Sequence, residues 1–142
     1  LIKGIHEYGW NKPLGVQQIA VMPIIANQNV IGHVTQGNIG KTGAFSIAAI
    51  HRVSPYNRST QVLIISAKEA AKQTFDIISK IGVYMKRTSY LCGESNINND
   101  MSALAKGKQI VIGTAGRIND LITKNALKVG RLRLFVIDGA DE

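Results

Sequence analysis

Residues 62–82 read VLIISAKEAAKQTFDIISKIG, and this stretch decides the fold. Its first four residues, Val62–Ile65, are apolar and mostly β-branched, which is typical of a short strand covered on both faces. From Lys68 to Ile81 the apolar residues return with helical spacing, and Gly82 follows at the expected C-cap position. The stretch therefore predicts a buried strand that leads directly into an amphipathic helix.

The same alternation extends in both directions along the chain. Further helices are predicted at residues 14–26 (after Pro13), 41–50, 98–106 and 116–123, and further strands at 29–34, 89–91, 109–112 and 134–137. Strands that alternate with helices indicate a three-layer α/β domain, in which a mostly parallel sheet is covered by helices on both faces. Ligands of such sheets bind beyond the carboxyl ends of the strands, so the residues after Val34, Ile65, Ile112 and Ile137 are the candidates for function.

Composition limits the class of protein, its partners and its compartment. The chain has 142 residues, of which 45% are hydrophobic and 18% charged, so we expect one globular domain. No apolar run approaches the roughly 20 residues that span a bilayer, and the N-terminus does not resemble a signal peptide. Lys and Arg outnumber Asp and Glu by 17 to 9, a balance that suits a polyanionic partner. Cys92 is the only cysteine, which indicates a reducing, cytoplasmic or nuclear compartment and a small buried side chain.

Gly40-Lys41-Thr42 carries a phosphate-binding signal, because it is predicted to follow a strand and to open a helix. A phosphate loop needs inward-facing backbone N–H groups, a Lys for the β- and γ-phosphates and a hydroxyl for Mg²⁺. Lys41 and Thr42 provide the last two, although Thr35 stands where the full pattern has its first Gly. The alternative is an ordinary helix start with a solvated Lys.

Asp138-Gly139-Ala140-Asp141 follows the last predicted strand. An acid at this point can hold Mg²⁺ beside a phosphate loop. Asp-Gly is also a common turn pair, so a plain polar turn is the alternative. The upstream Gly40-Lys41-Thr42 favours the metal interpretation of Asp138.

Five segments in this order resemble the motifs of the DEAD-box RNA helicases. Residues 8–17 resemble the Q motif, residues 35–42 motif I, residues 68–71 the second half of motif Ia, residues 114–117 motif Ib, and residues 138–141 the Asp-Glu-Ala-Asp segment itself. The flanking residues 1–5 and 133–137 are similar to the initiation factor 4A branch. The resemblance implies that residues 1–142 are an incomplete first RecA-like domain, truncated at its C-terminal end and without the second such domain.

The resemblance also implies roles for individual residues. Gln17 would read adenine, and the nucleotide would be bound by Thr35, Gln36, Gly37, Asn38, Ile39, Gly40, Lys41 and Thr42. Lys41, Asp138 and Asp141 would be catalytic, with Mg²⁺ held by Thr42 and, through water, by Asp138. RNA phosphates would be bound by Lys68, Gly93, Thr114, Gly116 and Arg117.

Several positions depart from the family pattern. Asn38 and Ile39 replace small residues of motif I, Glu94 replaces the second Gly of a paired-glycine motif that contacts RNA, and Ala115 replaces a Pro. The first half of motif Ia is one residue short and reads Ser66-Ala67. Gly139 stands where the family has the Glu that activates water, and loss of a general base typically lowers a rate about 10²–10⁴-fold.

The leading hypothesis is part of an ATP-dependent RNA helicase that uses ATP and Mg²⁺, binds RNA through its backbone and works in the cytoplasm, with the nucleus as the alternative. A scaffold protein of an initiation or RNA-processing complex is the protein partner that the resemblance suggests, and no membrane is expected. The second hypothesis is a degenerate member that binds nucleotide or RNA without hydrolysis. The third is a P-loop nucleotide kinase or other small NTPase, against which Gln17 and residues 114–117 argue.

Overall fold

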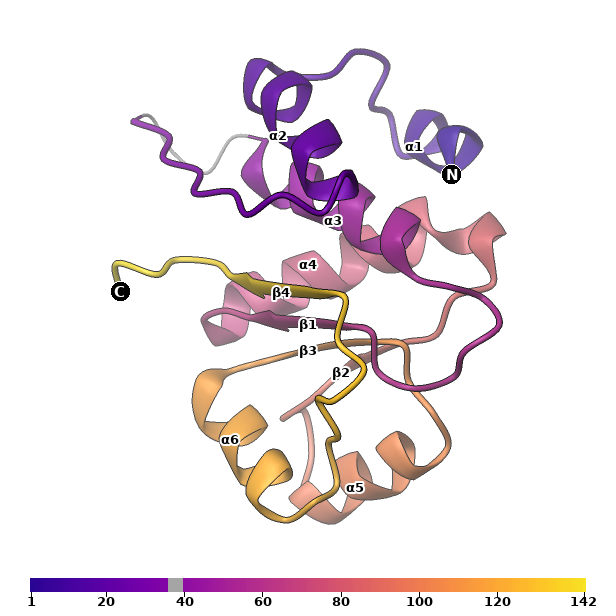
Figure 1. Ribbon diagram of the computed structural model, residues 1–142, viewed down its shortest axis with the longest axis vertical. Coiled ribbons are helices and arrows are strands. Elements are labelled where there is room, and N and C mark those ends of the chain that lie inside the picture. The colour runs from indigo at the N-terminus through magenta and orange to yellow at the C-terminus, as the bar shows by residue number, and fades with distance from the viewer. Residues whose placement is uncertain (36–39) are drawn as a thin grey trace.

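The computed structural model describes residues 1–35 and 40–142. Four strands alternate with helices along the chain (Figure 1). In order, the elements are α1 (Ile2–Glu7), α2 (Gly15–Ile25), α3 (Lys41–Arg52), β1 (Val62–Ile65), α4 (Lys68–Ile81), the 3₁₀ turn η1 (Val83–Met85), β2 (Ser89–Leu91), α5 (Ile97–Ala105), β3 (Ile110–Gly113), α6 (Ala115–Thr123) and β4 (Leu134–Ile137).

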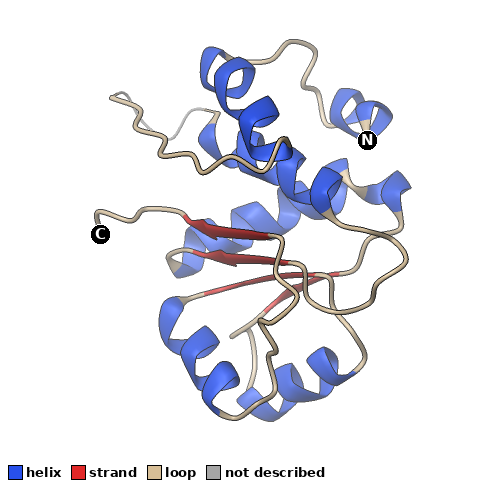
Figure 2. Cartoon of the chain, in the orientation of Figure 1, coloured by secondary structure: helices blue, strands red, loops and turns tan. Residues whose placement is uncertain are grey.

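The four strands form one parallel sheet in the order β2-β3-β1-β4. Figure 2 shows helices on both sides of it. Side chains alternate between the faces: Val62 and Ile64 of β1 pack with α3 and α4, whereas Leu63 packs with α5 and α6. The predicted three-layer α/β fold is confirmed, and the helices that separate successive strands explain why the strands can be parallel.

Most predicted elements lie where the sequence placed them. The strands at residues 62–65, 89–91 and 134–137 and the helix at 68–81 have the predicted bounds, and the other helices and the strand near residue 110 differ by one or two residues at their ends. Gly82 is the C-cap of α4 and donates its N–H to the carbonyl of Ile78.

One predicted strand is wrong. Residues 29–34 form no strand and pair with no described strand, and Ile31 is fully exposed. The outer edge of β4 has no neighbouring strand within residues 1–35 and 40–142. A strand requires a partner for its backbone hydrogen bonds, and the apolar run at 29–34 does not find one here.

The short helix α1 was not predicted. It packs onto the end of α4, where a Cβ on Gly4 would overlap the carbonyl of Ile81. A glycine at this position therefore allows the two backbones to approach closely. Within the described residues, no helix is long and apolar enough to cross a membrane.

Candidate functional site

The predicted adenine-reading segment packs against the start of α3, although about 25 residues separate them in the chain. Gln17 is buried, and its Oε1 accepts a hydrogen bond from the backbone N–H of Leu14 at 3.0 Å. A Cβ on Gly43 would lie 2.6 Å from Gln17 Nε2 and 3.0 Å from the Trp10 ring. Gln17 is thus held in place beside the first turn of α3.

Gly40 is the residue on which α3 begins. Its φ of 89° is left-handed, and a Cβ would lie 2.6 Å from Val16 Cγ1, so both the backbone and the packing require glycine. No side chain caps this end of α3. Lys41 and Thr42 are half-buried in the first turn, where the unpaired N–H groups carry partial positive charge.

The predicted nucleotide loop therefore lies only partly within the described residues. Gln36, Gly37, Asn38 and Ile39 lie outside the described residues, and Thr35 is exposed at their border. The helix that opens at Lys41 is present, but the strand predicted before the loop is not formed.

Asp138 directly follows β4 and lies at the carboxyl edge of the sheet. Its backbone N–H donates to the carbonyl of Ile65 at 2.9 Å, and the residue is half-buried. Figure 1 shows the start of α3 and the end of β4 on the same side of the molecule. Asp141, the other predicted catalytic acid, is exposed beyond Gly139.

Gly139 has a φ of 71°, a left-handed conformation that side chains other than glycine rarely adopt. The carboxyl group of Glu142 folds back towards it, with Cδ 3.5 Å from the point where a Cβ on Gly139 would stand. A carboxylate is thus present beside this position, although Gly139 itself has none.

The residues present are chemically suited to Mg²⁺. Thr42 offers a hydroxyl and Asp138 a carboxylate, the hard oxygen ligands that this ion prefers alongside phosphate and water. No group of three or more His, Cys, Asp or Glu side chains that could bind a metal occurs in the part of the chain that the structure describes. A magnesium site completed by nucleotide phosphates and water needs only one or two carboxylates from the protein.

A hollow of about 360 Å³ lies at the carboxyl ends of β2 and β3. We call it the α4–α6 hollow. All five residues that the sequence suggested for RNA binding line it: Lys68, Gly93, Thr114, Gly116 and Arg117. They come from three separate parts of the chain, so their meeting in one hollow is a property of the fold.

Both α4 and α6 begin in the wall of this hollow. Lys68 is the first residue of α4, and Thr114 is the N-cap of α6; no side chain caps either helix. Around Gly116 nothing lies within 4 Å of the position of a Cβ, so a ligand can approach the backbone. Two uncapped helix starts and the cations of Lys68 and Arg117 make this wall suitable for an anion.

Glu94 introduces a negative charge into the same hollow. Its carboxylate pairs with Lys72 Nζ at 3.1 Å, and both side chains are about half exposed. The exposed pair contributes little to stability. The pair does, however, neutralise the Lys72 ammonium group, which could otherwise interact with a phosphate.

Asp100 is a buried acid beside the hollow that the sequence analysis did not single out. It is fully buried, and it accepts hydrogen bonds from Tyr90 Oη (2.8 Å), the Gly93 N–H (3.0 Å) and Arg117 Nη1 (2.6 Å). A signal was present: Asp100 occupies the apolar face of its helix, between Ile97 and Leu104. An acid at such a position needs partners, because burial of an unpaired charge is unfavourable.

The surroundings of Asp100 also change two neighbouring groups. Burial, followed by the hydrogen bond to Asp100, raises the pKa of Tyr90 to about 12. Burial, followed by the charge of Asp100, raises the pKa of the Cys92 thiol to about 12. The expectation of a small buried Cys92 is confirmed, since the residue is 5% exposed and the thiol is free.

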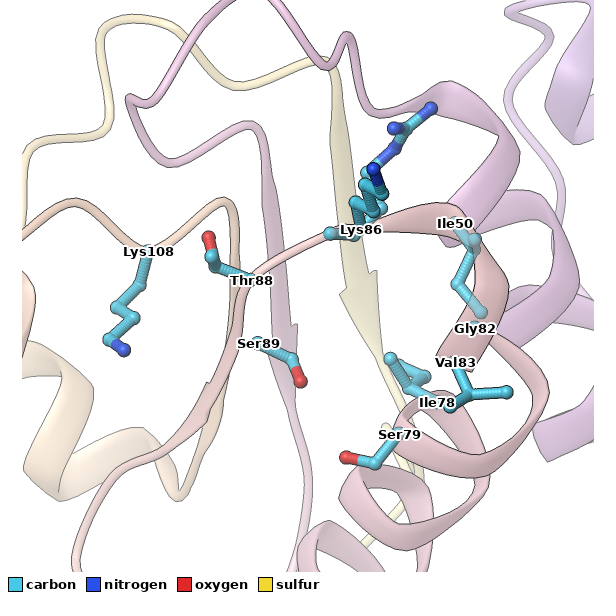
Figure 3. A pocket seen from close by; sticks show the side chains of 10 residues that line it. Ile50, Ile78, Ser79, Gly82, Val83, Lys86, Thr88, Ser89 and Lys108 are labelled. Atoms are coloured by element: carbon cyan, nitrogen blue, oxygen red, sulfur yellow. The ribbon is translucent and has the colours of Figure 1, made fainter.

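A second hollow, of about 350 Å³, lies at the opposite, amino ends of β2 and β3 (Figure 3). It is lined by Ser79, Thr88, Ser89, Lys86 and Lys108 among others, and by none of the residues suggested for nucleotide or RNA. In Figure 3 the side chains of Ser79 and Lys108 lie well apart. Its polar groups do not converge on one point, so the candidate site remains at the carboxyl edge.

The chain is similar to known proteins over its whole length. The chain is 39% identical to the ATP-dependent RNA helicases eIF4A of Aspergillus clavatus and Aspergillus niger, over all of this chain and 36% of theirs. The eIF4A of Mycosarcoma maydis is 38% identical, with 35% of its length covered. The chain thus spans about a third of the length of these relatives.

Solved structures show the same fold. A variant of S. cerevisiae Dbp5 bound to Nup159, Gle1, IP6 and ADP matches 99% of this chain and 37% of its own, with a TM-score of 0.81 and 29% identity. S. cerevisiae Dbp5 bound to RNA and ADP BeF3 matches with a TM-score of 0.78 and 27% identity, over 99% of this chain and 36% of its own. The profile of the DEAD/DEAH box helicase family matches residues 15–142, and the chain belongs to that family.

Proposed function

We propose that this chain is the ATP- and RNA-binding part of an ATP-dependent RNA helicase, whose full-length form couples ATP hydrolysis to remodelling of RNA duplexes. One observation carries the proposal: Lys68, Gly93, Thr114, Gly116 and Arg117, from three parts of the chain, line one hollow at the carboxyl edge of the sheet. Family membership and the fold shared with Dbp5 support it.

RNA would be held through its phosphates. Arg117 and Lys68 offer cations, and the uncapped starts of α4 and α6 offer backbone N–H groups. Cations and backbone N–H groups suit phosphate oxygens, so we propose binding that is independent of sequence and sensitive to salt.

The nucleotide would lie at the start of α3. Gln17 Nε2 makes no hydrogen bond to another described residue, so it would donate to an adenine ring nitrogen while its Oε1 remains bound to Leu14. Lys41 would contact the β- and γ-phosphates, and Thr42 and Asp138 would hold Mg²⁺, which supplies charge neutralisation at those phosphates. Asp141 would be a further catalytic acid after β4.

Hydrolysis requires that a water molecule lose a proton as its oxygen attacks the γ-phosphorus and the bond to the β-phosphate oxygen breaks. Gly139 offers no side chain to take that proton. We propose that hydrolysis is slow in a protein that carries Gly139. The alternative is a protein that binds nucleotide and RNA without hydrolysing ATP, which we call the clamp. The test below distinguishes the two.

The test uses this chain extended to the complete two-domain protein, here named the extended protein. A fluorescent ATP analogue with Mg²⁺ is titrated, and phosphate release is followed with and without RNA, with Lys41→Ala as the matched variant. Binding that Lys41→Ala removes, with release stimulated by RNA, supports a working helicase. Binding without release supports the clamp, and no binding by the parent overturns the nucleotide site.

The setting is part of the same proposal. A scaffold protein of an initiation or RNA-processing complex is the expected protein partner, and the cytoplasm, or alternatively the nucleus, the expected compartment. The free, buried Cys92 agrees with a reducing compartment.

A further inference from the structure

The α4–α6 hollow is organised by a residue that does not line it. Asp100 belongs to α5 and is fully buried, whereas Gly93 and Arg117 face the hollow. One oxygen of its carboxylate, Oδ2, accepts hydrogen bonds from both the Gly93 N–H and Arg117 Nη1. A single buried atom thus joins two parts of the hollow that lie more than 20 residues apart in the chain.

The other contacts fix this carboxylate in turn. Tyr90 in β2 donates its hydroxyl to Oδ1 at 2.8 Å, so both carboxylate oxygens are engaged. Arg117 Nη1 also donates to the carbonyl of Ser95 at 3.1 Å. Hydrogen bonds to a buried ionised group are stronger than neutral ones, and they hold the guanidinium in one orientation.

The geometry leaves part of Arg117 available. Among the hydrogen bonds of the described residues, only Nη1 of this side chain donates, and the side chain is 24% exposed. A guanidinium has further donors on Nη2 and Nε in a fixed plane. With Nη1 tied to Asp100, those donors can meet a phosphate without first losing the freedom of the side chain.

We propose that Asp100 is a positioning residue, which holds the Arg117 guanidinium and the Gly93 loop in the arrangement that binds an RNA phosphate. The inference rests on the proposed function, and it assigns to an acid a favourable role in binding a polyanion. Electrostatics alone predicts the opposite effect of Asp100 on RNA affinity, because removal of a negative charge near a phosphate site strengthens the binding of RNA.

The opposite signs make the test sharp. In the extended protein, Asp100→Asn is compared with Asp120→Asn, which removes the same charge from an exposed residue that also lines the hollow. Affinity for a fluorescent single-stranded RNA is measured across a range of salt concentrations. We expect Asp120→Asn to bind RNA more tightly than the parent. We expect Asp100→Asn to bind RNA about tenfold more weakly, as after loss of one charge-assisted hydrogen bond. The slope of log affinity against log salt concentration should become less steep by about 0.7, the value for one phosphate contact.

A double-mutant cycle separates positioning from a loss of stability. If Asp100 acts mainly through Arg117, Asp100→Asn weakens RNA binding much less in the Arg117→Ala background than in the parent, and the loss that remains is the contribution of the Gly93 loop. Additive losses, or tighter binding by Asp100→Asn, would overturn the inference. Circular dichroism at the assay temperature shows whether each variant is folded.

Tyr90→Phe keeps the inference testable if Asp100→Asn does not fold. It removes only the hydroxyl that holds Oδ1, and we expect a smaller loss of RNA affinity in the same direction; parental affinity would contradict the inference. Arg117→Ala alone tests the proposed function. If Arg117→Ala binds RNA as the parent does, the RNA site itself fails, whereas weak binding by Arg117→Ala with full binding by Asp100→Asn refutes only the positioning role.

Discussion

Gln17 and Gly43 are in such close contact that a Cβ on Gly43 would lie 2.6 Å from Gln17 Nε2. The contact joins the segment that would read adenine to the helix that would hold the phosphates. It also places the Trp10 ring against the same glycine. The two halves of the proposed nucleotide site are thus one packed unit.

The first prediction concerns the stability of this unit. Gly43→Ala places a methyl group against Gln17 and Trp10, so either α3 or the preceding segment must shift. We expect the free energy of unfolding to fall by about 1–3 kcal/mol, the usual effect of overpacking. Chemical denaturation of the extended protein measures it. Gly116→Ala is the matched control, because α6 has open space at that Cβ, and it should leave stability unchanged or slightly higher.

The second prediction concerns nucleotide choice. Gln17→Glu keeps an acceptor for the Leu14 N–H but replaces the Nε2 donor by a second acceptor, which would repel an adenine ring nitrogen. We expect affinity for the ATP analogue to fall about tenfold or more and preference over GTP to be lost. Competition between the two nucleotides, measured by fluorescence, tests this. Unchanged preference would remove Gln17 from the proposed site.

The third prediction follows from the raised pKa of the Cys92 thiol. The folded protein keeps the thiol neutral up to about pH 12, whereas the unfolded chain loses its proton near the ordinary pKa of 9.0. The stability due to this group is therefore fully present below pH 9 and is lost as pH rises from about 9 to 12. Cys92→Ala should reduce the loss of stability in that range, while the raised pKa of Tyr90 still contributes a loss above about pH 10. Alkylation at pH 8 should be slow until denaturant is added, and rapid alkylation of the folded protein would contradict the burial.

The fourth prediction concerns Glu94. Its carboxylate pairs with Lys72 at the α4–α6 hollow, and Glu94→Gln would release that cation towards an RNA phosphate. We expect RNA to bind about three- to tenfold more tightly, with a steeper dependence on salt, and little change in stability because the pair is exposed. Glu7→Gln makes the same change of net charge on α1 and should not affect RNA binding. Equal effects of the two substitutions would indicate a response to net charge alone.

The regular elements were predictable because their signals are local. The apolar runs at Val62–Ile65 and Leu134–Ile137 are strands as predicted, since β1 is buried and β4 pairs along it. The run at Asn29–Val34 looks similar in sequence, but a strand also needs a neighbour, which no local pattern shows. The short α1 depends on the contact of Gly4 with Ile81, which is likewise not local.

The candidate site shows the same division. The five residues suggested for RNA meet in one hollow, and their binding of RNA stays a prediction. Asp100 escaped notice because its importance lies in partners from β2, the following loop and α6, which only the fold brings together. Sequence patterns find residues that act directly on a ligand more readily than residues that hold others in place.

The last prediction concerns hydrolysis. Gly139→Glu in the extended protein introduces a carboxylate at the position where the resemblance implies a water-activating Glu, and we expect RNA-stimulated phosphate release to rise about 10²-fold or more. The left-handed φ of 71° opposes the change by about 1–2 kcal/mol in stability, a modest effect beside the gain in rate. Gly139→Gln has the same size without the base and serves as the control.

The role of Glu142 determines how an unchanged rate of phosphate release in Gly139→Glu would be interpreted. Its carboxyl group already lies beside Gly139, so we propose it as the acid that accepts the proton in the parent protein. If the parent hydrolyses ATP and Glu142→Gln abolishes that activity without weakening nucleotide binding, Glu142 supplies the base. If Gly139→Glu, Gly139→Gln and the parent all release phosphate equally slowly, the absence of the Glu is not what limits hydrolysis.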